Sequence, residues 1–158
     1  MTGNERPEIT TTSEAETRRL GERIGERLQH GDVVLLSGDL GTGKTCLAQG
    51  IARGLGITQN VSSPSFVLMN EYSGRERLFH VDLYRLNSIE EMDDLGLWDY
   101  AEQGVLVIEW PERGAELLPG DGLHIDLAHG DAERTRVLQL HPRGPRGETI
   151  ADGVEVRT

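Results

Sequence analysis

Basic side chains, cysteine and aromatic residues are all scarce in this sequence. Its 158 residues include 16 lysines and arginines against 27 aspartates and glutamates, for a formal net charge of −11. This balance excludes the broad basic face that nucleic-acid-binding domains present to the phosphate backbone. The single cysteine, Cys46, excludes an internal disulfide and is typical of a reducing compartment. We therefore expect no direct sequence-specific binding of nucleic acid.

Long hydrophobic runs are missing as well. The longest purely aliphatic runs are VVLL at 33–36 and VLVI at 105–108, far shorter than the roughly 20 residues of a membrane-spanning helix. The first residues, MTGNERPEITTTSEAE, lack the apolar stretch of a secretory signal. The length suits one domain, and charged residues make up 27% of the chain. The sequence thus predicts a soluble, cytoplasmic protein with no membrane contact.

Hydrophobic periodicity predicts strands alternating with helices. The predicted helices span 14–29, 44–55 and 88–102, and the predicted strands span 33–36, 65–72, 77–84, 105–109, 123–127 and 135–140. The strand at 33–36 is apolar on both faces, which is typical of a central parallel strand. The strands at 65–72 and 77–84 are expected to form a hairpin, and those at 123–127 and 135–140 a closing antiparallel pair. The fold class is therefore α/β, with a parallel core sheet to which antiparallel strands are added.

The two ends of the chain show no clear period. Residues 1–11 are polar, and the sequence after Pro142, RGPRGETIADGVEVRT, is rich in glycine and charge. We expect 1–11 to be a flexible N-terminus and 142–158 to be a weakly ordered tail. The folded domain is expected to span 12–141.

The stretch SGDLGTGKTC at 37–46 matches the phosphate-binding pattern G-x-x-x-x-G-K-[ST] at every fixed position. A predicted strand precedes it and a predicted helix follows, as such a loop requires. The glycines let successive backbone N–H groups converge on phosphate, and the helix N-terminus adds positive potential. The residues expected to bind the nucleotide phosphates here are Gly38, Asp39, Leu40, Gly41, Thr42, Gly43, Lys44, Thr45 and Cys46. The pattern predicts a P-loop NTPase three-layer sandwich.

Lys44 is the only lysine in the chain, because every other cationic side chain is an arginine. A compact ammonium on a flexible stem suits the β- and γ-phosphates better than the wider planar guanidinium does. The hydroxyl of Thr45 is expected to bind magnesium. Cys46 is expected to be a small buried residue, since nothing in the sequence partners it as a nucleophile. The motif thus predicts a nucleoside triphosphate and Mg²⁺ as ligands.

Two acids are placed to complete such a site. Glu109 ends the strand VLVIE, and ligands of parallel sheets bind at the carboxyl ends of the strands. Asp82 shares one strand face with His80. We expect Glu109 to bind magnesium directly or through water, and Asp82 to contact the metal or the attacking water, and these roles are interchangeable. The alternatives are that Asp82 only pairs with Arg85 and that Glu109 is a surface acid.

Three other features each admit two interpretations. A buried core role competes with a catalytic one for His80, and the core role is favoured. Trp110 is either an ordinary core or rim aromatic, or a sensor of nucleotide or a contact for a partner. The hydroxyl-rich stretch Ser62–Ser65 is either a Ser/Pro turn or a switch loop that responds to the γ-phosphate.

From about Thr17 to Leu140 the chain resembles the TsaE family of small P-loop ATPases, which serve threonylcarbamoyladenosine formation in bacterial tRNA. The resemblance rests on ETRRLGERIGERL, GDLGTGKT, SSPSFVLMNEY, FHVDLYRL and VLVIEWPERG, with LPG after it, in this order and with matching gaps. These elements together are far more specific than the phosphate loop alone. Cys46 departs from the family pattern, in which a second threonine is common, and Ser65 replaces a threonine but keeps its hydroxyl.

The resemblance implies an ATP hydrolase, slow on its own, that acts on the partner proteins TsaD and TsaB and does not modify tRNA itself. The nucleotide cofactor that it implies is therefore ATP. It places catalytic roles on Lys44, Asp82 and Glu109, and magnesium binding on Thr45, Asp82 and Glu109. It places a switch or partner contact on Ser65 and Trp110. Toward the base it adds Ser13 with Thr12, and Arg136 with Arg134, as weaker candidates.

Three rival functions share the phosphate loop. A small P-loop kinase needs an acceptor pocket and an arginine-bearing lid, for which this length leaves little room. A GTPase needs a guanine-reading N-K-x-D element, which the sequence lacks. A nucleotide-dependent binding module with negligible turnover uses the same phosphate-binding parts, so the sequence alone does not separate it from a slow ATPase.

Overall fold

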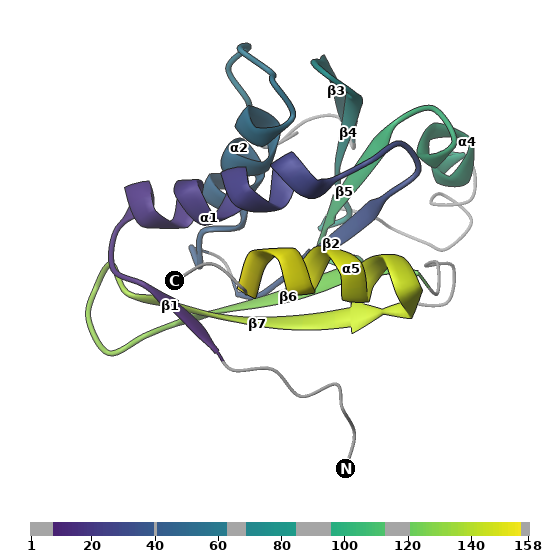
Figure 1. Cartoon of the computed structure of the whole chain (residues 1–158). Helices are drawn as coiled ribbons and strands as arrows, with labels where there is room; N and C mark the ends of the chain where they lie inside the picture. The colour runs from purple at the N-terminus through teal and green to yellow at the C-terminus, as the bar shows by residue number, and fades with distance from the viewer. Residues whose placement is uncertain (1–7, 40, 63–68, 85–95, 113–120, 156–158) are drawn as a thin grey trace.

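A seven-stranded mixed sheet forms the centre of the molecule in the computed structural model, which describes residues 8–39, 41–62, 69–84, 96–112 and 121–155 (Figure 1). The strands are β1 (Ile9–Thr11), β2 (Val33–Ser37), β3 (Met69–Ser73), β4 (Arg77–Asp82), β5 (Val105–Glu109), β6 (Gly122–His129) and β7 (Arg136–Arg143). The helices are α1 (Glu14–Arg27), α2 (Lys44–Gly54), α4 (Leu97–Ala101) and α5 (Gly144–Glu155). No described helix has the length and apolarity that crossing a bilayer demands.

The sheet has a parallel centre and antiparallel edges. Its strand order is β1-β7-β6-β2-β5-β4-β3. Strands β6, β2, β5 and β4 pair in parallel, whereas β1, β7 and β3 join antiparallel to their neighbours. Every residue of β2 and β5 is buried, as strands covered on both faces require. The predicted parallel core with added antiparallel strands is confirmed.

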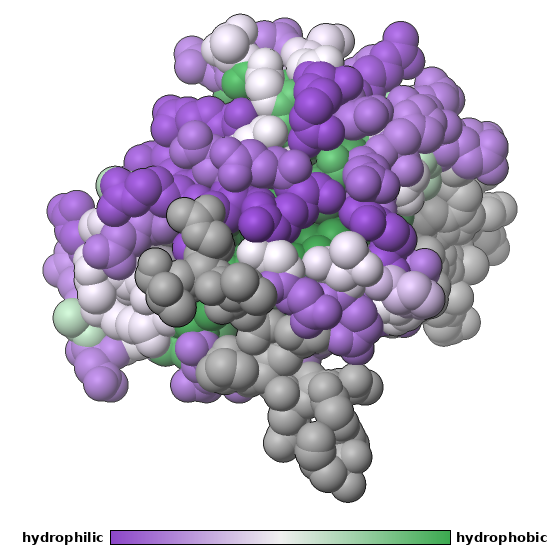
Figure 2. All heavy atoms as spheres, viewed as in Figure 1, coloured by the Kyte–Doolittle hydropathy of each residue, from purple (hydrophilic) through white to green (hydrophobic). Residues whose placement is uncertain are grey.

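Helices cover both faces of this sheet, which makes three layers. The first core cluster contains Val34 and Leu36 of β2 together with apolar residues of α1, α2 and α5. The second contains the alternate residues Val33 and Leu35 together with Leu97 of α4. Successive strand residues therefore enter opposite layers. Figure 2 shows that the outward surface over α1 and α5 is mostly hydrophilic.

Helices α1 and α2 pack unusually closely, because glycines line their contact. A Cβ added at Gly50 of α2 would lie 2.1 Å from the backbone oxygen of Arg18 in α1. A Cβ added at Gly21 of α1 would lie 2.5 Å from the backbone oxygen of Leu47 in α2. Since no side chain larger than hydrogen fits at these points, the two glycines set how deeply α2 seats against α1. The N-terminus of α2 is the end of the phosphate-binding loop, so this contact also positions the site.

The prediction for the C-terminal tail is wrong over 144–155, which form α5. Ile150, Ala151 and Val154 are fully buried in the first core cluster. Arg146 anchors the helix, because its Nε and Nη2 donate to Asp32 Oδ1 at 2.9 Å and Oδ2 at 2.6 Å. This hydrogen-bonded pairing raises the pKa of Arg146 above its usual value. A Cβ at Gly147 would lie 2.0 Å from the backbone oxygen of Gly122, so that glycine serves close packing.

Smaller differences occur at other boundaries. Residues 9–11, expected to be flexible, form β1 and pair with β7. Helix α1 ends at Arg27, two residues before the predicted end. The residues at 65–68 and 88–95 of the predicted strand and helix lie outside the described residues, as do 156–158 of the predicted tail. The predicted pair 123–127 and 135–140 is confirmed and is longer, as β6 with β7.

We predict that Ile150→Ala lowers the free energy of unfolding by about 2–5 kcal/mol, the usual cost of truncating a buried isoleucine. Urea denaturation of the full chain measures this. The control is Thr149→Ala, at an exposed neighbour in the same helix, which should change the free energy by less than about 0.5 kcal/mol. Equal, small effects of both substitutions would contradict the docking of α5 on the sheet.

Candidate active site

Three strands end side by side at the edge of the sheet that carries the glycine-rich loop. Parallel pairing sets Leu36 of β2 opposite Glu109 of β5, and Asp82 of β4 opposite the same Glu109. Two backbone bonds continue the alignment past the strand ends, from Trp110 N–H to the Leu36 oxygen (3.1 Å) and from Leu83 N–H to the Glu109 oxygen (3.0 Å). The register therefore brings both predicted acids beside the loop that follows β2.

The loop between β2 and α2 depends on glycine backbone conformations. Gly38 has φ 142° and Gly43 has φ 99°, and both values favour glycine. Side-chain volume is also excluded at Gly38, where a Cβ would lie 2.4 Å from the Leu127 backbone oxygen. Thr42 Oγ1 donates to the Asp39 backbone oxygen (2.8 Å) and closes the turn. Gly43 is the N-cap of α2, and Lys44 is the first residue of that helix.

Lys44 folds back over this loop. Its side chain is only 5% exposed, and Nζ donates to the backbone oxygens of Gly38 (2.5 Å) and Asp39 (2.9 Å). Nζ also lies 4.3 Å from the centroid of the Trp110 ring, within cation–π range. Burial lowers the pKa of Lys44, while carboxylates, Glu109 first among them, act in the opposite direction. The ammonium is thus held at the site by oxygen atoms, an aromatic ring and nearby negative charge.

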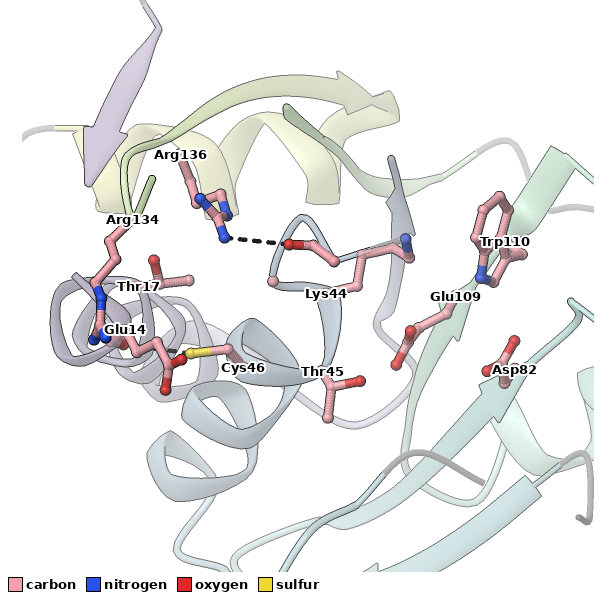
Figure 3. Close-up of a pocket in the computed structure, with 12 residues that line it drawn as sticks. Glu14, Thr17, Lys44, Thr45, Cys46, Asp82, Glu109, Trp110, Arg134 and Arg136 are labelled. Carbon is pink, nitrogen blue, oxygen red and sulfur yellow. Dashed lines mark hydrogen bonds between the residues drawn. The ribbon is translucent and has the colours of Figure 1, made fainter. Parts of the chain in front are cut away.

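A cavity of about 320 Å³ opens in front of the loop (Figure 3). It is lined by Glu14, Thr17, Gly41, Gly43, Lys44, Thr45, Cys46, Asp82, Glu109, Trp110, Arg134 and Arg136. Figure 3 shows Thr45, Glu109 and Asp82 on one side of this space, and Glu14, Arg134 and Arg136 on the other. The hydroxyl of Thr45 and the carboxylates of Asp82 and Glu109 therefore lie across the cavity from the two arginine guanidinium groups.

The two acids differ in their surroundings. Glu109 is 3% exposed, and its Oε2 lies 2.6 Å from Nε2 of His80, which is fully buried. Asp82 is partly exposed, and its Oδ1 accepts from the backbone N–H of Tyr84 (2.9 Å). The interpretation of Glu109 as a surface acid is therefore wrong. The alternative pairing of Asp82 involves Arg85, which lies outside the described residues.

Trp110 has a strained backbone. Its φ of 58° is the one positive value of a non-glycine residue in the described ranges, and aromatic residues rarely adopt it. The ring packs against that of Tyr84, with 4.8 Å between centroids, and over the Lys44 ammonium. Such strain is typical of functional sites, where surrounding contacts hold the residue in place.

Other predicted ATP-binding residues lie at different distances from the cavity. Gly38, Asp39 and Thr42 belong to the loop but do not line the cavity. Ser13 does not line it either, because its Oγ caps α1 by accepting from the Glu16 N–H (3.1 Å). Leu40 and Ser65 lie outside the described residues.

Two cavity residues, Glu14 and Thr17, were not predicted. Both belong to the start of α1, and Thr17 Oγ1 is hydrogen-bonded to Thr11 Oγ1 of β1 (2.7 Å). The only signal in the sequence is the helix start marked by Ser13 and Glu16. The structure completes only half of a capping box there, since the Glu16 carboxylate accepts from Thr12 and not from the Ser13 N–H.

Arginines of the last hairpin reach the loop from the other side. Arg136 Nη2 donates to the Gly41 backbone oxygen (3.2 Å), and Nη1 donates to the backbone oxygens of Glu133 (2.7 Å) and Thr135 (3.0 Å). Arg134 lines the same side of the cavity. These contacts place two cations beside the loop in a chain whose net charge is −11.

The donor set suits a magnesium–nucleotide complex. Hydroxyl and carboxylate oxygens of Thr45, Asp82 and Glu109 are of the type that Mg²⁺ prefers, and the N-terminus of α2 suits phosphate. Among the described residues, no group of three or more His, Cys, Asp or Glu side chains could hold a metal ion.

Comparison with known proteins identifies the family. The family model for threonylcarbamoyl adenosine biosynthesis protein TsaE matches residues 11–138. The chain belongs to the TsaE family. A Treponema pallidum protein named tRNA threonylcarbamoyladenosine biosynthesis protein TsaE is 44% identical over 127 residues, covering 78% of this chain and 94% of that protein. A Nostoc protein of the same name is 41% identical over 148 residues, covering 90% of each chain.

A solved structure shares this fold. The crystal structure of Bacillus subtilis YdiB superposes with a TM-score of 0.79 and 31% identity, covering 95% of this chain and 94% of that one. The predicted P-loop NTPase type of α/β sandwich is therefore confirmed. A TsaE-family chain thus carries the loop, the two acids and Trp110 at one edge of its sheet.

Cys46 lines the cavity and is only half-buried, so the prediction of a buried residue is wrong. Burial still raises the pKa of its thiol above the usual value.

We predict that iodoacetamide labels Cys46 more slowly than a free thiol at pH 8, because less thiolate is present, and that the rate keeps rising above pH 9. Mass spectrometry measures this at a unique cysteine, with Cys46→Ser as the blank. A rate plateau below pH 8 would contradict the raised pKa.

Proposed function

We propose that this chain is a magnesium-dependent ATPase of tRNA threonylcarbamoyladenosine biosynthesis that acts on the partner proteins TsaD and TsaB. The observation that carries the proposal is the meeting of Lys44, Thr45, Asp82 and Glu109 around one cavity at the N-terminus of α2. The names of the TsaE relatives supply the pathway. The absence of a membrane-spanning helix among the described residues is compatible with action in the cytoplasm.

Backbone and lysine together provide the phosphate-binding part. Gly41 and Gly43 line the cavity, so the loop backbone there approaches a ligand without a side chain in between. The Lys44 ammonium, which bonds the oxygens of Gly38 and Asp39, offers its charge to the same space. A compact charge in a low-dielectric pocket stabilises the negative charge that develops during phosphoryl transfer.

Thr45, Asp82 and Glu109 provide the oxygen atoms. Thr45 and one or both acids would hold Mg²⁺, which neutralises phosphate charge when bound. Glu109 is the stronger candidate for orienting an attacking water, since its carboxylate is buried and fixed by His80, whereas Asp82 is partly exposed. Fixed groups cost no reorganisation during the reaction.

The far side of the cavity suits the rest of the nucleotide. Arg134 and Arg136 offer positive charge there, while Glu14 and Thr17 offer acceptors and a hydroxyl. Ser65 is proposed to sense the nucleotide as part of a switch loop, and Trp110 to transmit its presence to a partner. The acidic charge of the chain fits a protein that binds other proteins and leaves tRNA to them.

Phosphate release from ATP by the full chain, with and without TsaD and TsaB, tests the proposal. We predict slow release alone and faster release with the partners. Lys44→Ala, Asp82→Ala and Glu109→Ala should each lower it about 100-fold or more, as for other electrostatic groups at a reacting centre. Lys44→Ala should also abolish support of tRNA modification in a reconstituted reaction.

The matched control is Glu102→Ala, which removes an exposed acid away from the cavity and should leave the rate unchanged. Equal rates in wild type, Asp82→Ala and Glu109→Ala would contradict the assignment of the acids. Saturable nucleotide binding without phosphate release, even with both partners, would instead favour a binding module. Failure to bind TsaD or TsaB in any nucleotide state would contradict the partner assignment.

A further inference from the structure

His80 is a buried polar residue directly behind the candidate active site. It belongs to β4 and is fully buried, and its strand neighbours Phe79 and Val81 enter the opposite layer of the core. His80 pairs in register with Val107, two residues before Glu109 in β5. Its side chain therefore lies on the same sheet face as Glu109, one step further from the sheet edge.

The contact between the two side chains is short and specific. His80 Nε2 lies 2.6 Å from Glu109 Oε2, and both side chains are almost completely buried. His80 Nδ1 is buried as well and has no hydrogen-bond partner among the described residues. The interaction with Glu109 is thus the one polar contact that the structure describes for this ring.

This arrangement assigns the tautomer. A buried N–H without a partner is rarer and more costly than a buried lone pair without one. The proton therefore belongs on Nε2, which donates to Glu109 Oε2, and Nδ1 carries the lone pair. A carboxylate is an acceptor only, so the donor is required of the histidine.

The bond restricts what Glu109 can do. With Oε2 accepting from His80, Oε1 is the oxygen available to a ligand in the cavity that Glu109 lines. Without His80, a nearly buried carboxylate would lose its one described side-chain partner and would be free to rotate. Hydrogen-bond donors behind a ligating or reacting carboxylate commonly fix its orientation.

We propose that His80 is a positioning residue, which holds the Glu109 carboxylate through an Nε2–H donor so that Oε1 faces the magnesium or the attacking water. The proposal rests on the proposed ATPase function for its consequence, but the hydrogen bond itself does not depend on turnover. His80 then has a role beyond packing. An apolar residue of equal volume would fill the same space but would give Glu109 no hydrogen-bond donor.

Three variants of the full chain separate this role from packing. His80→Leu removes the donor, and His80→Gln restores an N–H donor near the position of Nε2. Leu78→Val is the matched control, because Leu78 is fully buried two residues earlier on the same strand face and pairs in register with Val105, four residues before Glu109. Thermal unfolding of all three shows which effects follow from lost stability.

Two readouts do not require turnover. Long-range ¹H–¹⁵N NMR of the histidine rings, with His80 assigned by the missing signals in His80→Gln, should show a proton on Nε2 and none on Nδ1. Binding of Mn²⁺ with ADP, measured by electron paramagnetic resonance, should weaken about 10–100-fold in His80→Leu if Glu109 contacts the metal, the usual cost of losing an outer-shell partner. It should recover in His80→Gln and stay near wild type in Leu78→Val.

Turnover supplies the third readout. If Glu109 orients the water, we expect kcat in His80→Leu to fall about 10–100-fold while KM for ATP changes little, as when an interaction made only in the transition state is lost. If Glu109 contacts the metal, KM for ATP should rise as Mn²⁺ binding weakens. A fall in kcat without weaker Mn²⁺ binding, restored in His80→Gln, also supports positioning and assigns Glu109 to the water.

A proton on Nδ1 overturns the proposal, and so does a His80→Leu variant whose Mn²⁺ binding and kcat both match wild type. Equal losses in His80→Leu and Leu78→Val overturn it too. If wild type releases no phosphate even with TsaD and TsaB, the ATPase proposal fails, while the NMR and Mn²⁺ results still decide the role of His80.

Discussion

The parallel pairing of β5 with β2 on one side and β4 on the other is the constraint on which the site depends. Because Glu109 lies opposite both Leu36 and Asp82, one register sets the loop, the two acids and Trp110 at a single edge. A slip of one residue in either pair would turn Glu109 or Asp82 to the other sheet face. The apolar residues before each acid hold that register, since alternate ones must enter different core layers.

Lys44 is the point at which these elements meet. It begins α2, whose depth is set by the glycine contacts with α1, and it bonds the oxygens of the loop that ends β2. It also lies under Trp110, the residue that follows β5. Every other residue counted among the lysines and arginines of this chain is an arginine. A lysine suits this position because a compact ammonium on a flexible stem fits between the loop and the Trp110 ring better than a planar guanidinium does.

Much of this arrangement could be predicted from the sequence, because the relevant signals are local. The motif at 38–45 and the apolar runs before Ser37 and Glu109 predicted the loop and its neighbouring strands. Helix α5 was missed because Gly144, Pro145 and Gly147 resemble breakers, although proline is favoured in a first helical turn and Gly147 serves packing. Glu14, Thr17 and the His80–Glu109 bond depend on helix packing and strand register, which no local pattern encodes.

Titration of the full chain with ATP by isothermal calorimetry, with and without magnesium, tests the central claim most directly. The account predicts saturable one-to-one binding that strengthens with magnesium, is lost in Lys44→Ala and is retained in Arg53→Ala, an exposed position of the same helix. Binding of equal strength in Lys44→Ala, or no binding by wild type, would contradict it.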